Sequence, residues 1–355
     1  MSRLKKIYID PEAIDPNSVK KVASFIRQGK IVALPTETVY GLAANMDKEN
    51  ALKRLYKVKH RPEGMPSTVH IGTPHDIEFF LDVMPTYGYK LIEKFWPGPL
   101  TIIYYRKDSP DTLGVRCPDH PVTSAILKES LCKVVMPSAN VLGRPPAVSA
   151  AQVEEIFGDR IDYIVESLPP KLKVSSTVVD LTKTPFALLR EGTITRKDIE
   201  EVINTRKVLF ICTGNTCRSV MAEYLLKLYL TKKREDLAGK VEIISCGAHA
   251  SEGFPASEEV KKLLLEEGID ASQHHSKKIT RTLARSSDII IVMEKHHRDS
   301  VMHTDPLAVP RTFLTGSFLK DYDKDIPDPI GGTEEDFKKS FELIKQAVEE
   351  IVKWL

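Results

Sequence analysis

The 355-residue chain is poor in cysteine and in net charge, and it contains no long apolar run. Five cysteines are too few, and odd in number, for a disulfide framework, which favours a reducing, cytoplasmic environment. No segment is apolar over the roughly 20 residues that a membrane-spanning helix needs, and residues 1–10 lack the apolar centre of a signal peptide. The formal net charge of +2 gives no indication of nucleic-acid binding. We therefore expect a cytoplasmic protein that does not use a membrane.

The chain also has no internal repeat and no low-complexity tract. A hydrophobic content of 42% is that of a globular protein, and 355 residues suggest two domains of ordinary size. A change in pattern near residue 205 divides them, so we expect domains at 1–205 and 206–355.

The strongest motif of the second half follows the apolar segment 207–211. Its residues KVLFI predict a strand, CTGNTCRS predicts a tight polar loop, and a helical pattern follows. Strand, loop and helix in this order direct backbone N–H groups at an anion bound at the helix N-terminus. Inside the loop lie Cys212, a sulfur nucleophile, and Arg218, whose guanidinium grips two phosphoryl oxygens. The alternative is a buried structural cysteine beside an arginine at a helix start.

The other residues of this loop are candidates for holding a phosphate. Gly214 permits a left-handed turn, and Asn215 can tie the loop through its amide. The remaining loop candidates are Thr213, Thr216, Cys217 and Ser219. A leaving group needs a proton, and Asp328, held between two prolines, is the predicted general acid, with Asp325 as a weaker candidate.

Strands and helices alternate in the second half. We expect strands at 207–211, 241–245 and 288–293 and helices at 220–230 and 258–267. A last helix should begin near Thr333, with Asp336 completing its cap. Alternation of this kind predicts an α/β domain with a doubly wound parallel sheet and a site at the carboxyl ends of its strands.

CTGNTCRS, followed by MAE and later by a DP pair, closely resembles the low-molecular-weight protein phosphatase family. The resemblance covers residues 206–355 and implies a cysteinyl-phosphate mechanism with Cys212, Arg218 and Asp328, without a metal or cofactor. It also implies that Cys217 can form a reversible disulfide with Cys212, although a plain buried cysteine is an equal alternative.

The substrate of such a phosphatase is suggested by two further positions. Tyrosine-directed members usually carry a bulky aliphatic residue before the second loop cysteine and aromatic residues at the rim. Here Thr216 and Ile330 stand at these positions, and the segment SCGAHASEGF lacks a tryptophan common in the tyrosine enzymes. The pattern resembles the protein-arginine phosphatases, so we expect a phosphoarginine protein substrate, with a broad or tyrosine-directed phosphatase as the alternative.

The first half mixes helices and strands without strict alternation, which predicts an α+β domain with a twisted mixed sheet. We expect helices at 16–29, 51–58, 87–95 and 196–205, and strands at 30–34, 68–72, 100–105, 113–117, 133–136, 174–181 and 186–190. Residues 35–45, PTETVYGLAAN, are predicted to form a turn rich in hydroxyls.

PTETVYGL, a Lys-x-Arg at residues 59–61, SAN at 138–140, STVVDL and LLREG occur in the order found in the Sua5/YrdC family, the threonylcarbamoyl-adenylate synthases. The resemblance covers about residues 18–203. The family condenses L-threonine, bicarbonate and ATP into threonylcarbamoyl-AMP and pyrophosphate for the t6A modification of tRNA. It implies partners in tRNA or the t6A-transfer machinery, and Mg²⁺ bridging the phosphates of ATP.

This resemblance also implies the residues that bind each substrate. The implied ATP contacts are Lys59, Arg61, Thr112, Asn140 and Arg190. The implied threonine contacts are Thr38, His70, Arg116, Ser138 and Ser176, of which Ser138 also offers a hydroxyl to ATP. On composition alone, a single histidine on a strand such as His70 is more often a packed residue than a catalyst.

The sequence departs from this family at three places. Met65, Pro66 and Ser67 follow the Lys-x-Arg pair where the family usually has KPL or NPL. Leu142 replaces a serine, and Val148 stands where a hydroxyl is common. These changes remove polar ATP contacts, so a degenerate domain retained for RNA binding is the alternative to a synthase.

Overall fold

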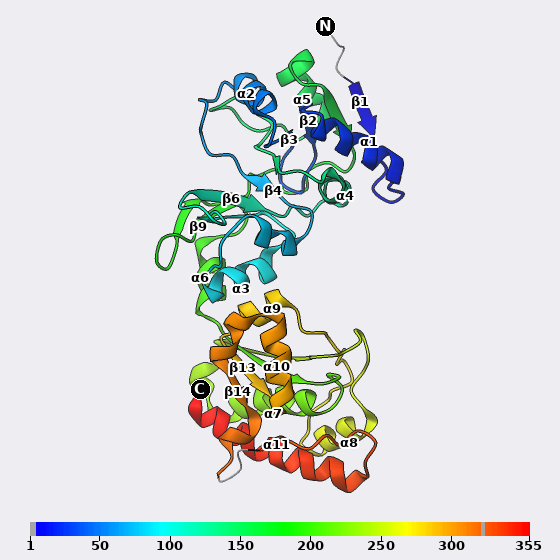
Figure 1. Cartoon of the computed structure of the whole chain (residues 1–355), viewed down its shortest axis with the longest axis vertical. Coiled ribbons are helices and arrows are strands. Elements are labelled where there is room, and N and C mark those ends of the chain that lie inside the picture. The colour runs from blue at the N-terminus through cyan, green and yellow to red at the C-terminus, as the bar shows by residue number, and fades with distance from the viewer. Residues whose placement is uncertain (1–4, 321–323) are drawn as a thin grey trace. The chain divides into compact units, whose positions relative to one another are not determined.

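The computed structural model describes residues 5–320 and 324–355 (Figure 1). The chain divides into two compact units, Met1–Glu200 and Glu201–Leu355, each with its own sheet. The expected boundary after residue 205 falls just beyond helix α6 (Arg196–Asn204). None of the helices within the described ranges is long and apolar enough to cross a membrane. The expected absence of a signal peptide concerns residues 1–10, of which 1–4 lie outside the described residues.

The first unit is built on a ten-stranded sheet in which parallel and antiparallel pairs are mixed. This confirms the predicted mixed α+β fold. In spatial order the strands are β1 (Lys5–Tyr8), β8 (Tyr163–Glu166), β2 (Val32–Leu34), β3 (Gly41–Asn45), β7 (Val134–Val135), β4 (Val69–His70), β6 (Thr112–Arg116), β5 (Leu100–Tyr105), β9 (Thr177–Asp180) and β10 (Ala187–Arg190).

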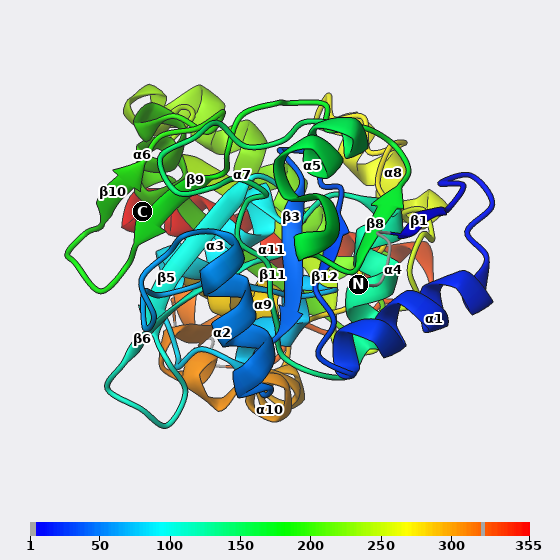
Figure 2. The ribbon, with the colours of Figure 1, turned by 90° about the horizontal axis from the view of Figure 1, so that it is seen from above.

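Helix α1 (Pro16–Arg27) shows how the sequence sets the helices of this unit. The side chain of Asp15 accepts hydrogen bonds from the backbone N–H groups of residues 17 and 18 and so caps the first turn. The chain leaves the helix through Gly29 at φ +87°, a left-handed conformation that suits glycine. α1 packs beside α4 (Pro121–Ser130), as Figure 2 shows. The other helices are α2 (Glu49–Val58), α3 (Thr86–Phe95) and α5 (Ala150–Phe157).

One prediction for this unit is wrong in part. Residues 35–40 form a turn, in which the Thr36 hydroxyl accepts hydrogen bonds from the N–H groups of Thr38 and Val39. Residues 41–45, however, form the buried strand β3, which pairs with β2 and β7. GLAAN has no β-branched residue, so its pairing with neighbouring strands outweighs a weak local preference.

The second unit contains a four-stranded sheet whose strands are all parallel. In spatial order the strands are β12 (Val241–Gly247), β11 (Arg206–Cys212), β13 (Ile289–Val292) and β14 (Thr312–Leu314). The order reverses at β11, and helices cover both faces, which confirms the predicted doubly wound α/β fold.

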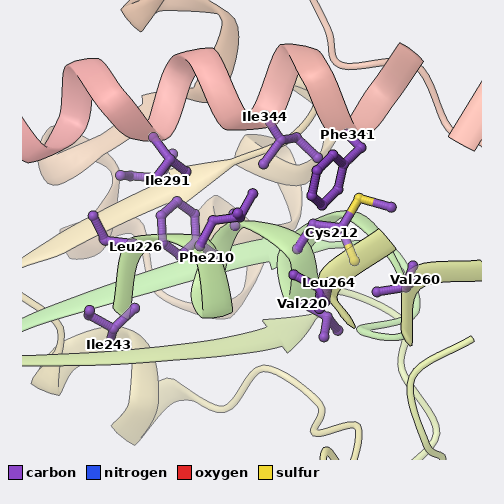
Figure 3. Close-up of a cluster of buried hydrophobic side chains, with 14 of the residues drawn as sticks. Phe210, Cys212, Val220, Leu226, Ile243, Val260, Leu264, Ile291, Phe341 and Ile344 are labelled. Carbon is purple, nitrogen blue, oxygen red and sulfur yellow. The ribbon is translucent and has the colours of Figure 1, made fainter. Parts of the chain in front are cut away.

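Alternating side chains of β11 reach the two hydrophobic cores of this unit. Val208, Phe210 and Cys212 face α7 (Arg218–Lys233), α8 (Glu258–Glu266) and α11 (Glu334–Trp354). Leu209 and Ile211 face α9 (Arg281–Ser286) and α10 (Lys295–Thr304). Figure 3 shows the first core, in which side chains of α11 point toward the strand that ends in Cys212.

Helix α11 begins as predicted. The side chain of Thr333 accepts a hydrogen bond from the Asp336 N–H, and the Asp336 carboxylate accepts one from the Thr333 N–H. Its apolar stripe is buried and consists of Phe337, Phe341, Ile344, Val348 and Ile351.

Candidate active sites

The first unit contains a cleft lined by six of the ten residues predicted to bind ATP or threonine. They come from separate parts of the chain and are Arg61, His70, Arg116, Ser138, Ser176 and Arg190. The pairing of strands in the sheet brings the ends of β4, β6 and β10 to the cleft. The segments that follow α2 and β7 complete it. The cleft therefore combines three guanidinium groups with an imidazole and hydroxyls.

Arg116 lines this cleft and is held by several hydrogen bonds, with an exposed fraction of only 5%. Its Nη2 donates to Glu37 Oε1 at 2.5 Å and to Thr38 Oγ1 at 2.8 Å, and its Nε donates to the Gly98 carbonyl at 3.2 Å. Glu37 is itself buried and accepts a second hydrogen bond from the Asp119 N–H. Thr38 thus contacts Arg116 and is not among the residues that line the cleft.

Glu37 is a site residue that the sequence reasoning missed. A signal was available, because it is a carboxylate inside the hydroxyl-rich turn PTETVYGL. A charged residue that is 7% exposed needs a partner of opposite charge, and Arg116 is that partner.

His70 lies in the cleft as a neutral base. Burial, and next the charge of Arg116, lower the pKa of His70 to about 3. Its Nδ1 lies 3.3 Å from the Thr68 carbonyl oxygen, which can only accept, so Nδ1 carries the proton. Nε2 is then left as a hydrogen-bond acceptor for a ligand.

Arg190 and Ser176 are joined across β9 and β10. The Arg190 Nε donates to the Ser176 carbonyl at 2.8 Å, and Nη2 donates to the Ser176 hydroxyl at 3.1 Å. The same hydroxyl lies 2.9 Å from Thr101 Oγ1. This network fixes both predicted contacts at the cleft wall.

Lys59 and Asn140 brace the loop at residues 138–140 and do not line the cleft. The Lys59 ammonium donates to the Ser138 carbonyl, to the Asn140 carbonyl at 2.7 Å and to Asn140 Oδ1 at 3.2 Å. Ser138 Oγ donates to Asn140 Oδ1 at 2.7 Å. Burial, and next the charge of Arg61, lower the pKa of Lys59 to about 7.

Thr112 is not brought to the cleft. It is exposed at the start of β6, whereas Arg116 lines the cleft from the other end of that strand, roughly 13 Å away at the usual rise per residue. Of the departures from the family pattern, Met65 and Leu142 are exposed and do not line the cleft. Pro66 does line it and accepts a hydrogen bond from Arg61 Nη2.

The cleft offers no clear protein ligand set for Mg²⁺. Mg²⁺ prefers carboxylate and phosphate oxygens, and within the described part of the chain no carboxylate is among the residues lining the cleft. The residues present suit the phosphates and carboxylate of the substrates that the resemblance implies, and Mg²⁺ bound with such a nucleotide would be held mainly by its phosphates.

In the second unit, the loop after β11 surrounds the Cys212 sulfur. The Asn215 N–H donates to Cys212 Sγ at 3.2 Å, and Ser219 Oγ lies 3.0 Å from the same sulfur. Cys212 is buried at the carboxyl end of β11, and residues 213–217 connect it to the N-terminus of α7. This arrangement suits an anion bound beside the sulfur.

The left-handed residue of the loop is Asn215, at φ +56°, and not Gly214 as predicted. Asparagine tolerates this conformation when its side chain is held. Asn215 Nδ2 donates to Ser219 Oγ at 3.0 Å and to Ser245 Oγ at 2.7 Å, and Oδ1 accepts from the Lys277 N–H at 2.9 Å.

Arg218 is 1% exposed and lies between two carboxylates. Its Nη1 donates hydrogen bonds to Glu294 Oε1 and, at 2.8 Å, to the Ile326 carbonyl. Its Nη2 donates to Asp328 Oδ2 at 2.5 Å. The predicted acid therefore lies beside the predicted phosphate ligand, while Asp325 accepts from the Lys295 N–H at the start of α10.

Glu294 and His297 are site residues that the sequence reasoning missed. Glu294 follows the end of β13 after one intervening residue, and parallel strands bring their carboxyl ends to one edge, which was the available signal. His297 Nε2 lies 3.0 Å from the Thr213 hydroxyl, and Nδ1 accepts from the Glu294 N–H at 3.1 Å. Burial above all lowers the pKa of His297 to about 3.

Thr216 and Cys217 form the side of the loop next to α8. The Thr216 carbonyl accepts from the Ser257 N–H at 3.0 Å, and Cys217 Sγ lies 3.5 Å from Ser257 Oγ. Burial raises the pKa of the Cys217 thiol. Both loop cysteines are free thiols, so the disulfide implied by the resemblance stays a prediction.

One cluster of potential metal ligands occurs among the described residues: Glu294, His296 and His297. Its donor atoms are already engaged. Glu294 contacts Arg218 and His296, and both ring nitrogens of His297 have partners. The cluster therefore gives no reason to assign a metal.

Comparison with known proteins assigns each half of the chain to a family. A family model described as telomere recombination, for Sua5, YciO and YrdC, matches residues 24–192. A model described as low molecular weight phosphotyrosine protein phosphatase matches residues 207–355. A putative threonylcarbamoyl-AMP synthase of Mycobacterium tuberculosis is 34% identical over 55% of this chain and 92% of its own length. The chain therefore belongs to the threonylcarbamoyl-AMP synthase family, and it is a fusion of such a domain with a low-molecular-weight phosphatase domain.

Longer relatives and solved structures add detail. Threonylcarbamoyl-AMP synthase of Pyrococcus abyssi is 38% identical over 56% of this chain, and the match spans only 60% of its length. The structure of Pyrococcus abyssi Sua5 complexed with L-threonine shares the fold with a TM-score of 0.53 and 23% identity, covering 96% of this chain and 97% of that one.

For the second unit, the similar structures include phosphatases of two named activities. A YwlE arginine phosphatase of Geobacillus stearothermophilus is 32% identical over 42% of this chain and 92% of its own, with a TM-score of 0.38. The tyrosine phosphatase AmsI of Erwinia amylovora is 30% identical over 42% and 93%, with a TM-score of 0.39.

Proposed function

We propose that the first unit makes threonylcarbamoyl-AMP and pyrophosphate from L-threonine, bicarbonate and ATP, and so supplies the t6A modification of tRNA. The observation that carries this proposal is the cleft in which Arg61, Arg116 and Arg190 converge. Three guanidinium groups suit a reaction between an amino-acid carboxylate and a triphosphate. The membership of the synthase family supports the same reading.

The contacts suggest a division of roles within the cleft. Arg116, fixed by Glu37, is suited to the threonine carboxylate. The unprotonated Nε2 of His70 is suited to accept a hydrogen bond from the threonine hydroxyl or amine. Arg61 and Arg190 are left for the phosphates. Catalysis then consists of positioning and charge neutralisation, without a protein nucleophile.

The variant Arg61→Ala tests this assignment. It should lower threonine-dependent pyrophosphate release at least tenfold, because a charged contact to the phosphates is lost. Phosphatase activity of the same preparation is the internal control for folded protein. Unchanged pyrophosphate release would remove Arg61 from the proposed site. Wild-type protein without threonine-dependent release would favour the alternative of a weakly active, RNA-binding module.

We further propose that the second unit hydrolyses phosphoproteins through a cysteinyl-phosphate intermediate. The Cys212 thiolate attacks phosphorus, Arg218 binds two phosphoryl oxygens, and Asp328 donates a proton to the leaving group. Water then attacks the Cys212 phosphoryl group, Asp328 accepts its proton, and phosphate leaves. The support is that the Asn215 N–H donates to Cys212 Sγ, while Arg218 donates both to Thr213 of the same loop and to Asp328.

Two variants test this mechanism. Cys212→Ser should abolish turnover, because a neutral hydroxyl is a poor nucleophile in this position. Asp328→Asn should slow phosphoenzyme formation about 10²- to 10⁴-fold with poor leaving groups and less with 4-nitrophenol. An active Cys212→Ser variant would contradict the covalent mechanism, and activity should persist in a metal chelator.

The finer proposal is that the substrate is phosphoarginine. Its support is Thr216, a half-buried hydroxyl in the loop, where an isoleucine would pack on a phenyl ring and crowd a planar, polar guanidinium. Ile330, after the DP pair, is 58% exposed and leaves the rim without an aromatic residue there. The description of the matching family favours phosphotyrosine, which remains the alternative substrate.

A further inference from the structure

The N-terminus of α10 contacts residues 212–219, here called the phosphate loop, through two residues. Glu294 caps this helix and holds Nη1 of Arg218. His297, three residues on, is fully buried and reaches the other side of the same guanidinium through Thr213. None of the roles proposed above uses His297.

The contacts of His297 fix which ring nitrogen carries its proton. Nδ1 lies 3.1 Å from the backbone nitrogen of Glu294, which can only donate, so Nδ1 must present a lone pair. The proton of the neutral ring is therefore on Nε2, and Nε2–H donates to Thr213 Oγ1 at 3.0 Å.

This donation decides the orientation of the Thr213 hydroxyl. Its oxygen accepts from His297 and, at 3.5 Å, from Arg218 Nη2. A hydroxyl oxygen accepts at two lone pairs and donates once, so the Thr213 proton remains available as a donor. It lies beside the guanidinium that is proposed to bind the phosphoryl group.

We propose that His297 is a positioning residue that orients the Thr213 hydroxyl as a hydrogen-bond donor to the phosphoryl group. The inference rests on the proposed phosphatase function. The hydrogen bonds run in series: the Glu294 N–H donates to the imidazole, the imidazole donates to the Thr213 hydroxyl, and that hydroxyl donates to a phosphoryl oxygen. A preorganised donor of this kind stabilises charge on the phosphoryl oxygens without having to reorient during the reaction.

Two substitutions separate this role from a purely structural one. Asn in place of His297 keeps an acceptor near the Nδ1 position for the Glu294 N–H but loses the donor to Thr213. Gln keeps an amide N–H near the Nε2 position. If positioning is the role, His297→Gln should retain kcat/KM within about threefold, whereas His297→Asn should lose roughly 10- to 100-fold, as expected for one hydrogen bond to a charged group.

The variant Thr213→Val should show the same loss as His297→Asn, because it removes the hydroxyl without changing the size of the side chain. The double variant Thr213→Val/His297→Asn should be no worse than Thr213→Val alone, since the two residues act through one hydrogen bond. Hydrolysis of 4-nitrophenyl phosphate gives kcat and KM, and calorimetry with inorganic phosphate gives the matching loss of anion affinity.

His303→Asn is the matched control, because His303 is exposed on the same helix and, within residues 5–320 and 324–355, its ring contacts the Asp299 carbonyl and not the loop around Cys212. It should leave kcat/KM unchanged. Equal losses in His297→Asn and His297→Gln, or losses that add in the double variant, would overturn the inference while the phosphatase proposal stands. Wild-type protein that neither binds phosphate nor hydrolyses the ester would overturn both.

Discussion

At the scale of single residues, each proposed site is organised by an arginine that a carboxylate already holds. Arg116 is paired with Glu37 in the first unit, and Arg218 with Glu294 in the second. A buried guanidinium without such a partner would carry a large desolvation cost, and removing one partner of a buried pair costs about 3–5 kcal/mol. The carboxylates therefore hold each arginine in its buried position and orientation before substrate binds.

Thr216 is the residue on which the phosphoarginine proposal depends. We expect wild-type protein to hydrolyse phosphoarginine peptides faster than phosphotyrosine peptides. Thr216→Ile should shift the ratio of the two kcat/KM values toward phosphotyrosine by about tenfold, because one apolar group in a pocket discriminates by that order.

The measurement is the ratio of the two kcat/KM values, with Thr231→Ile as the control because Thr231 is exposed on α7. Equal or faster hydrolysis of phosphotyrosine by wild-type protein would count against the arginine assignment. It would leave the proposed role of Cys212 intact.

Lys59 gives the first unit a predicted pH dependence. Its pKa is lowered to about 7, so as the pH rises through 7 the ammonium loses its proton. The neutral amine has two N–H donors for the three oxygens that now accept from it. An anionic nucleotide favours the protonated form, so ATP binding should take up a proton and weaken up to about tenfold between pH 7 and pH 8.

Calorimetry of ATP binding in two buffers of different ionisation enthalpy measures this proton uptake directly. In Lys59→Arg the side chain stays charged at every pH used, so the affinity should lose this dependence. The same proton uptake in the variant would exclude Lys59 as its source.

At the scale of elements, the phosphate loop is shaped by the strand next to it. Gly247 ends β12 and lies against the loop: a Cβ there would stand 2.6 Å from the Thr213 carbonyl oxygen and 2.9 Å from the Asn215 nitrogen. The loop and β12 must therefore fit each other closely for the amides to face one point.

Gly247→Ala should displace the loop. We expect a loss of about 1–3 kcal/mol in the free energy of unfolding from overpacking, and a loss of more than tenfold in phosphatase kcat/KM from the misplaced amides.

Gly239→Ala is the control: nothing lies within 4 Å of its Cβ, but its φ of +69° disfavours alanine. It should cost about 1 kcal/mol and leave kcat/KM unchanged, as denaturant titration and kinetics would show. Full activity of Gly247→Ala would contradict the close fit.

The elements also show what the sequence could predict and what it could not. β11, its loop and α7 were predictable because apolar residues, turn residues and helix formers change abruptly there. β3 was missed because GLAAN is specified by the strands on either side of it. Asn215 was missed as the left-handed residue because its conformation depends on Ser245 and Lys277, which lie far away in the sequence.

At the scale of the whole molecule, each proposed site lies within one unit. Every lining residue of the first cleft precedes residue 200, and the residues around Cys212 all follow it. Each unit also has its own hydrophobic core. The two activities should therefore be separable by single substitutions, with Arg61→Ala sparing the phosphatase and Cys212→Ser sparing the synthase. Loss of both activities in either variant would show that the sites depend on each other.

The most direct test of the account is pyrophosphate release from ATP by the full chain. We predict release only when L-threonine, bicarbonate and ATP are all present, because threonylcarbamoyl-AMP contains parts of all three. Cys212→Ser protein should give the same result, which excludes a contribution from the phosphatase. Release that does not depend on threonine, or no release at all, would contradict the synthase function and leave a phosphatase joined to a binding module.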